Sequence, residues 1–137
     1  MSRSRLSTRP HGRSALEMEV WALWLDNKRG APAYRRQRRD WAMRWARHAA
    51  AEGRREDQRA TTLQGTGNRA GRRHVETFWR RPEIARLAYS TQMAMWRAIA
   101  DTWARAGIPH EPPRPLAPAQ QTQDSRTASH DPQPTEA

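Results

Sequence analysis

The amino-acid sequence predicts an all-α fold, a small bundle of three to four helices with a disordered basic N-terminal arm and a disordered proline-rich C-terminal tail. Apolar residues recur at helical spacing in several segments, and no segment alternates apolar and polar residues for long enough to form a strand. The 137 residues leave room for one domain. We expect the arm over residues 1–13, the helical domain over 14–107 and the tail over 108–137.

The arm is rich in arginine and serine and contains no acid. This composition is shared with organellar transit peptides, but a plain disordered arm is favoured, and secretion is not expected because no apolar stretch follows. The first helix is predicted to begin at Ser14, since Ser14 and Glu17 have the spacing of a capping box. It should run to about Arg29 and stop at Gly30, the residue best suited to a left-handed C-cap.

The second helix is predicted to begin near Pro32 and to end at Glu52, before Gly53. Helical geometry places Tyr34, Trp41, Trp45 and Arg38 on one narrow stripe, with Arg38 as a cation–π packing residue. Four arginines fall on the opposite side: Arg36, Arg39, Arg44 and Arg47. A short polar helix could follow over residues 54–60, and the glycine-rich stretch 65–71 is expected to be a mobile loop.

The C-terminal half of the domain is predicted to hold a short helical segment from Arg72 to Arg81 and a last helix from about Pro82 to Ala106. Apolar residues cover a wide arc of the last helix, which indicates packing against at least two other helices. From Pro109 onward proline, glutamine, serine, threonine and aspartate dominate. Such a composition lacks the apolar side chains that would offset the entropy of ordering, so this tail is expected to be disordered.

The charge of the chain points to a polyanionic partner. Lysine and arginine total 25 against 14 acids, a formal net charge of +11, which attracts DNA, RNA or an anionic membrane surface. Lys28 is the only lysine, and this preference for arginine is typical of coding in a high-GC genome. With no cysteine and no apolar run near the 20 residues of a transmembrane helix, we expect a cytoplasmic protein and no membrane partner.

The predicted contacts with nucleic acid are arginines of the second helix and of the segment after the glycine-rich stretch. A helix-turn-helix around Ala49 and Gly53 is not supported, because residues 54–60 contain no apolar residue larger than alanine that could dock a recognition helix against the first helix. Contacts with the phosphate backbone are therefore favoured. The alternative is an ordinary solvated helix face whose arginines pair with neighbouring acids. The candidate residues are Arg35, Arg36, Arg39, Arg44, Arg47, Arg54, Arg55, Arg69, Arg72 and Arg73. Backbone amides of the stretch 65–71 could form a nest for one phosphate, although a solvated linker is the favoured interpretation.

No catalytic, metal or cofactor site is expected. His48 and Glu52 are the only histidine and carboxylate at metal-ligand spacing, and a surface i,i+4 pair explains them better. No serine lies in a nucleophile elbow. The chain is therefore interpreted as a non-enzyme.

The leading hypothesis is a non-catalytic nucleic-acid-binding accessory protein of the kind that plasmids or phages of high-GC bacteria encode. The alternative is a helical interaction protein for plasmid transfer or phage assembly, acting through tryptophan-rich surfaces. A third idea, peripheral membrane association, is disfavoured because the core needs the amphipathic helices. Seven tryptophans with few aliphatic residues predict a marginal domain, which a homo-oligomer, a protein partner or a polyanion could stabilise.

Overall fold

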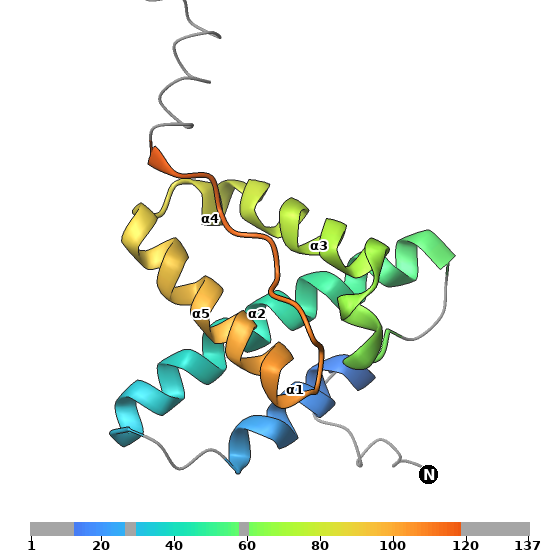
Figure 1. The fold of residues 1–137 in the computed structure, drawn as a ribbon, viewed down its shortest axis with the longest axis horizontal. Coiled ribbons are helices and arrows are strands. Elements are labelled where there is room, and N and C mark those ends of the chain that lie inside the picture. Colours follow the sequence, from blue (N-terminus) through green and yellow to red (C-terminus); the bar gives the residue numbers. More distant parts are fainter. Residues whose placement is uncertain (1–12, 27–29, 58–60, 119–137) are drawn as a thin grey trace, which may run out of the picture.

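A computed structural model describes residues 13–26, 30–57 and 61–118, and all regular structure within those ranges is helical (Figure 1). The all-α prediction is thus confirmed. No helix among the described residues is both long and apolar enough to cross a membrane. The elements in chain order are α1 (Ala15–Leu25), α2 (Pro32–Asp57), the 3-10 helix η2 (Gln64–Gly67), α3 (Arg69–Arg80), α4 (Pro82–Ala85) and α5 (Tyr89–Arg105).

Helix α2 is the centre of the bundle, and α1, α3 and α5 all pack against it. The core lies where these helices meet. Trp45 of α2 and Trp103 of α5 are fully buried, with ring centroids 6.4 Å apart in an edge-to-face arrangement. The aliphatic and aromatic side chains around them include Leu16, Val20, Val75, Phe78, Met95 and Ile99.

The capping box predicted at the first helix is confirmed. The Ser14 hydroxyl accepts from the Glu17 amide at 3.1 Å, and the Ser14 amide donates to the Glu17 carboxylate at 2.9 Å. Helix α1 ends at Leu25, earlier than expected, and residues 27–29 lie outside the described ranges. Gly30 has a φ of +79°, as the expected left-handed turn requires, and it directly precedes α2.

Helix α2 does not stop at Gly53 but continues to Asp57. The break expected there and the separate polar helix over 54–60 are therefore wrong as far as residue 57, and residues 58–60 lie outside the described ranges. Gly53 is buried, and a Cβ at this position would collide with the Thr61 hydroxyl. The absence of a side chain at Gly53 thus allows the chain at Thr61 to approach α2 closely.

The mobile loop predicted over residues 65–71 is also wrong, because η2 and the first turn of α3 occupy it. Asn68 caps α3 by accepting from the Gly71 amide at 2.8 Å, and the buried Thr66 hydroxyl donates to the Leu63 carbonyl at 2.7 Å. Helix α3 consequently begins at Arg69, three residues before the expected start at Arg72.

The last predicted helix is divided into α4 and α5. The side-chain amide of Gln92 donates to the carbonyls of Ile84, Ala85 and Leu87 at 3.0–3.2 Å. The Ile84 carbonyl also accepts from the Leu87 amide, so the Gln92 side chain adds to the backbone bonds that hold the turn between the two helices.

Residues 108–118, which we name the strap, were predicted to begin the disordered tail but pack on the bundle (Figure 1). Ile108, Pro112 and Pro115 are buried, and the indole N–H groups of Trp96 and Trp79 donate to strap carbonyls. The expected tail boundary at residue 108 is therefore wrong, because indole donors and buried side chains offset the entropy of ordering the strap. The expectations of disorder for residues 1–12 and 119–137 lie outside the described residues.

Candidate nucleic-acid interface

The solvent-facing side of α2 carries a row of four exposed arginines, Arg36, Arg44, Arg47 and Arg54, which we name the arginine stripe. At about 100° per residue, these positions lie about 100° to 180° from Trp45, which faces α5. The stripe therefore points away from the core. At a rise of about 1.5 Å per residue it extends over about 27 Å.

Three members of the stripe keep their guanidinium groups available. Arg36, Arg44 and Arg54 are exposed and have neither a hydrogen bond nor an ion pair within the described part of the chain. Asp40 is the acid that interrupts the row, and its carboxylate lies 3.7 Å from Arg39. The predicted one-sided row on α2 is thus present at these positions.

Three further candidates are held in ion pairs but remain largely exposed. Arg47 pairs with Glu17 at 3.2 Å, Arg55 with Glu52 at 2.6 Å and Arg73 with Glu56 at 3.5 Å. The arginine side chains are 72%, 72% and 53% exposed. Of these three pairs, only Arg73–Glu56 joins two exposed side chains, and such a pair contributes at most about 1 kcal/mol, so a phosphate can compete for Arg73. The carboxylates of Glu17 and Glu52 are 5% and 19% exposed, so a phosphate that binds Arg47 or Arg55 has to be accommodated beside these pairs.

Arg39 does not belong to the exposed row. Its guanidinium lies 4.3 Å from the centroid of Trp21, and its side chain is only 23% exposed. It therefore packs α2 against α1. Arg38 lies 5.2 Å from the centre of the Tyr34 ring, which confirms the cation–π packing predicted for that residue.

The glycine-rich segment leaves few backbone amides for the phosphate nest considered from the sequence. The amides of residues 65, 66, 68, 71 and 72 already donate within the protein, for example that of Gly71 to Asn68 and that of Arg72 to the Asn68 carbonyl. The Arg72 guanidinium donates to the Gly67 carbonyl at 3.1 Å, and Arg35 donates to that of Gly30 at 2.7 Å. Of these candidates only Arg69 is exposed and without a partner among the described residues.

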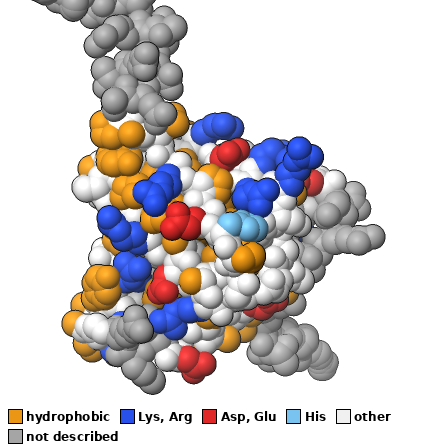
Figure 2. All heavy atoms as spheres, in the orientation of Figure 1, with side chains coloured by type: hydrophobic (Ala, Val, Ile, Leu, Met, Phe, Trp, Pro, Cys, Tyr) orange, Lys and Arg blue, Asp and Glu red, His pale blue; other side chains and the backbone are white. Residues whose placement is uncertain are grey.

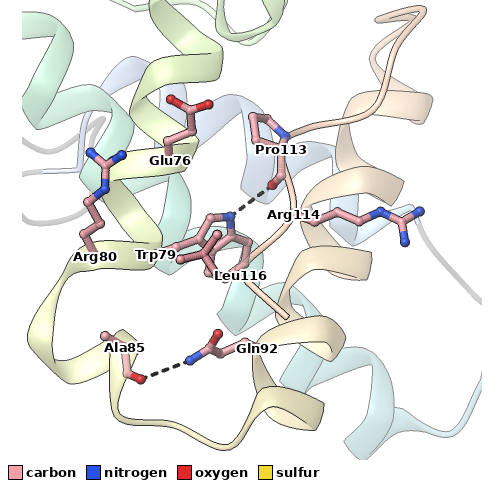
Figure 3. Close-up of a pocket in the computed structure, with 8 residues that line it drawn as sticks. All are labelled: Glu76, Trp79, Arg80, Ala85, Gln92, Pro113, Arg114 and Leu116. Atoms are coloured by element: carbon pink, nitrogen blue, oxygen red, sulfur yellow. Dashed lines mark hydrogen bonds between the residues drawn. The ribbon is translucent and has the colours of Figure 1, made fainter. Parts of the chain in front are cut away.

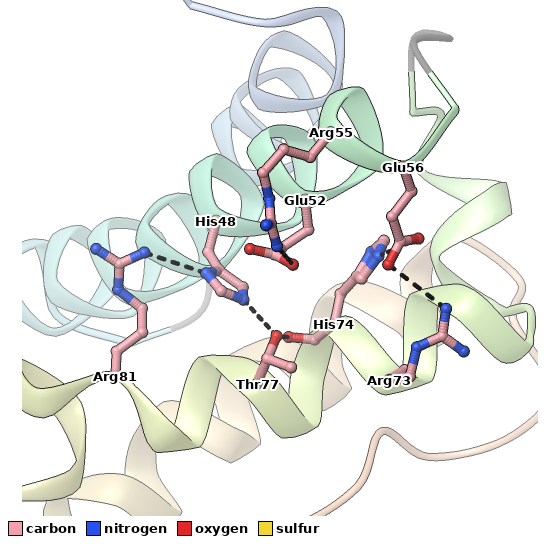
Figure 4. A network of polar contacts seen from close by, with 8 residues as sticks. All are labelled: His48, Glu52, Arg55, Glu56, Arg73, His74, Thr77 and Arg81. Atoms are coloured by element: carbon pink, nitrogen blue, oxygen red, sulfur yellow. Dashed lines mark hydrogen bonds and ion pairs between the residues drawn. The ribbon is translucent and has the colours of Figure 1, made fainter.

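A polar network joins α2 to α3 beside the stripe (Figure 4). Arg81 donates to Nδ1 of His48 at 3.2 Å, and Nε2 of His48 lies 2.8 Å from the Thr77 hydroxyl. That hydroxyl donates its own proton to the His74 carbonyl at 3.0 Å, so His48 Nε2 must be the donor to Thr77. Burial, opposed by the charge of Glu52 and assisted by that of Arg81, lowers the pKa of His48.

The His48–Thr77 pair has the wrong polarity for nucleophilic catalysis. A general base must accept the proton of the hydroxyl, whereas here His48 donates to it and the hydroxyl proton points to a backbone carbonyl. These contacts position α3 against α2.

Glu52, Glu56 and His74 are the described residues that could approach a metal ion together, with donor atoms within 4.8 Å of one another. Sequence reasoning examined only His48 with Glu52, because the pairing of His74 with α2 depends on the tertiary fold. Nε2 of His74 lies 3.1 Å from Glu56, and this hydrogen bond is the main cause that lowers the pKa of Glu56. The adjacent guanidiniums of Arg55 and Arg73 balance both carboxylates, so the group is an ion-pair network without excess negative charge.

The face that carries the strap has a different charge pattern. Figure 2 shows arginines and acids interspersed on this side. Arg105 lies 3.3 Å from Asp101, and Arg114 lies 3.4 Å from Glu111 and stacks over Trp96. This face offers no continuous basic row among these residues.

The tryptophans do not form an exposed surface. Trp24, Trp45, Trp79, Trp96 and Trp103 are buried, and Trp21 and Trp41 are partly buried against the core. The large apolar side chains that are exposed in the described residues are Leu25, Tyr34 and Leu116. The tryptophan-rich interface of the alternative hypothesis stays a prediction, and in the described residues these side chains are covered by the rest of the molecule.

No family model matches the chain, and no curated protein or solved structure matches it significantly. The function is therefore inferred from the residues of this chain alone.

Proposed function

We propose that this protein is a non-catalytic nucleic-acid-binding protein that holds the phosphate backbone through the arginine stripe of α2. The observation that carries the proposal is the row of Arg36, Arg44 and Arg54, which are exposed and make no side-chain hydrogen bond or ion pair with another described residue, although the charge of Arg44 acts on Glu83. Arg47 lies in the same row and pairs with Glu17 on α1. Arg55 and Arg73 border the row on the α3 side.

Arginine suits this task because its planar guanidinium bonds two phosphate oxygens at once. A straight row of about 27 Å approaches one turn of B-DNA, about 34 Å long, so several phosphates can be contacted together. The side chains lie on one uninterrupted helix that packs against α1, α3 and α5 and has buried residues from Ala42 onward, which fixes the backbone positions of Arg44, Arg47 and Arg54. Contacts with phosphates carry no sequence information, so we propose binding without strong sequence preference.

The test is fluorescence anisotropy of labelled duplex DNA and single-stranded RNA over about 50 to 200 mM salt. If Arg36, Arg44, Arg47, Arg54, Arg55 and Arg73 each neutralise one phosphate, the log–log slope of affinity against salt on duplex DNA is about −5. An absence of binding at low salt, or an affinity that does not change with salt, contradicts the proposal.

A matched pair of variants locates the interface. Arg44→Gln with Arg54→Gln removes two charges from the stripe, and Arg86→Gln with Arg97→Gln removes two exposed charges from the α4–α5 side. The stripe variant should reduce the magnitude of the salt slope by about 2, because each lost phosphate contact removes about one ion from the release. The α4–α5 variant should keep the wild-type slope, and equal effects of the two pairs would show that only the net charge matters.

A further inference from the structure

The strap is held in a groove whose contacts are those of an aromatic receptor for proline-rich peptides. The indole of Trp96 donates to the Pro112 carbonyl at 2.8 Å, and that of Trp79 donates to the next carbonyl, of Pro113, at 3.0 Å. The Arg114 guanidinium lies 4.2 Å from the centroid of the Trp96 ring. Aromatic grooves recognise extended PxxP segments in the same way, through ring faces and donors to main-chain carbonyls.

The spacing of the strap prolines fits this mode of binding. Prolines occupy every third position, 109, 112, 115 and 118, and an extended polyproline helix has three residues per turn. Pro112 and Pro115 are both buried in the groove. The two prolines of this PxxP unit are therefore buried together, and the carbonyls of Pro112 and Pro113 between them accept from the two indoles.

The helices supply the tryptophan side of the groove, and Pro113, Arg114 and Leu116 of the strap line its cavity as well. Trp79 lies beside Phe78 on α3, with ring centroids 5.3 Å apart. Gln92, on α5 with Trp96, holds the α4–α5 turn through its bonds to three backbone carbonyls. The indole donors therefore lie on packed helices, where they can receive another segment of the same chemistry.

The strap fills the groove only in part (Figure 3). A cavity of about 570 Å³ lies between α3, the α4–α5 turn and the strap, within the usual size range of ligand pockets. Trp79, Ala85 and Leu116 give it an apolar wall, and Arg80 and Gln92 add polar groups. Leu116 borders this space and remains 51% exposed, so a larger apolar side chain could occupy more of the cavity.

The two ends of the strap are anchored differently. The Ile108 amide donates to the Trp103 carbonyl at 3.0 Å, and His110 bonds the Gly67 carbonyl at 2.7 Å. Glu111 is exposed and separates these anchors from the proline unit. Residues 112–116 have contacts of their own, the two indole bonds and the contact of Arg114 with Trp96, so a partner segment would have to replace these while residues 108–110 stay in place.

We propose that this groove binds an extended proline-rich segment of another protein, and that residues 112–116 are its resident competitor. The partner segment carries a PxxP unit followed by a bulky apolar side chain that enters the cavity beside Trp79. The site lies on α3, α5 and the strap, away from the arginine stripe of α2, and does not depend on the proposed nucleic-acid binding. A tethered competitor acts at an effective concentration of about 1 mM, so binding to the wild type is weak unless the partner fits better.

The test uses the full chain and two labelled peptides: a copy of residues 109–118, and the same peptide with Leu116→Phe. Both are titrated by anisotropy against the wild type and against the double variant Pro112→Ala with Pro115→Ala, which weakens the resident segment. The double variant should bind the copied peptide at least about tenfold more tightly than the wild type does. The Leu116→Phe peptide should bind more tightly than the copy to both proteins, because it fills the cavity.

Adding Trp96→Phe to the double variant should remove most of the affinity, because one indole donor is lost, whereas adding Trp21→Phe on α1 should not. If the double variant loses its helical circular dichroism, NMR of the wild type with the Leu116→Phe peptide decides instead. Shifts of the Trp79 and Trp96 indole signals without a shift of Trp24 support the proposal. It is overturned if neither protein binds the peptides better than a scrambled sequence, or if the wild type self-associates through this groove and so uses a second copy as the occupant.

Discussion

At the scale of single residues, some buried polar groups hold the core together through hydrogen bonds and others lack a partner. The Trp24 indole donates to the buried Thr102 hydroxyl at 3.0 Å, which in turn donates to the Ala98 carbonyl. By contrast, the indole nitrogens of Trp45 and Trp103 are buried without a partner among the described residues. An unpaired buried donor costs about 1–3 kcal/mol, which is consistent with the marginal stability predicted from the thin aliphatic core.

His48 should make the stability of the protein depend on pH near neutrality. Because folding lowers the pKa of His48, the unfolded chain binds more protons than the folded one once the pH falls below about 6.5. The free energy of unfolding should therefore decrease from pH 7.5 to pH 5, by up to about 1.4 kcal/mol per pH unit. Urea denaturation followed by tryptophan fluorescence measures this change.

The control is His48→Gln, which keeps a donor for Thr77 and does not titrate. It should be less stable than the wild type at pH 7.5 but lose less stability between pH 6.5 and pH 5. Parallel curves for the two proteins would exclude His48 as the cause.

At the scale of elements, the close approach of η2 to α3 depends on the absence of a side chain at Gly71. A Cβ there would overlap the backbone carbonyl of Thr66, which cannot move without distorting η2. Gly67 is similarly enclosed, by the Ile108 side chain of the strap. The segment that reads as a flexible loop is thus a tightly packed corner.

Gly71→Ala should destabilise the protein by about 3 kcal/mol or more, because it overpacks a site walled by backbone. In a thermal melt this corresponds to a decrease in Tm of about 10 °C or more for a domain of this size. Gly65→Ala in η2 is the matched control, since its Cβ would lie 3.0 Å from the Thr62 hydroxyl, which can rotate. A similar loss in both variants would mean that helix propensity, and not the close approach, determines the effect.

The sequence predicts the helices well where a local signal sets them and poorly where a tertiary contact does. The capping box at Ser14 and the turn at Gly30 follow from local chemistry, and both are present. Gly53 and the glycines near residue 67 were interpreted as breaks, but glycine serves equally for close approach, which no local pattern distinguishes.

The same difference between local signals and tertiary contacts explains which candidate site residues the sequence could predict. Helical periodicity placed Arg36, Arg44 and Arg47 correctly on an exposed face, but not Arg54, which was assigned to a separate short helix and joins the face because α2 continues through Gly53. Periodicity within one helix could not show that Arg39 stacks on Trp21 of α1, nor that Arg72 donates to the Gly67 carbonyl. The approach of His74 to Glu52 and Glu56 was missed for the same reason.

At the scale of the whole molecule, the strap completes the bundle by covering α3 and α5. It returns from the end of α5 at Gly107, where φ is +82°, and reaches η2, α5 and α3 in turn. One sequence signal could have revealed it, namely the repetition of proline at every third position from Pro109 to Pro118. An interpretation based on composition alone takes those prolines as evidence for disorder, because composition does not include their spacing.

Ending the chain after Gly107 should therefore lower stability without removing the helices. The truncation uncovers Trp79 and Trp96 and removes the buried Ile108, which alone contributes roughly 1.5–3 kcal/mol. We expect the Tm to fall by about 10 °C or more, with the helical circular dichroism retained at low temperature. A chain ending after Pro118 should melt like the full protein, and an equal fall in both truncations would contradict this role of the strap.

The indole hydrogen bonds to Pro112 and Pro113 also provide a way to measure how often the strap leaves the groove. Each indole proton is protected from exchange with solvent deuterium only while the strap carbonyl covers it. The indole proton of Trp24 is bonded inside the helical core and should exchange only when the bundle itself unfolds. Dividing each exchange rate by that of a free indole gives the fraction of molecules in which that bond is open, and the excess of the Trp79 and Trp96 fractions over the Trp24 fraction is the population with an open groove and folded helices.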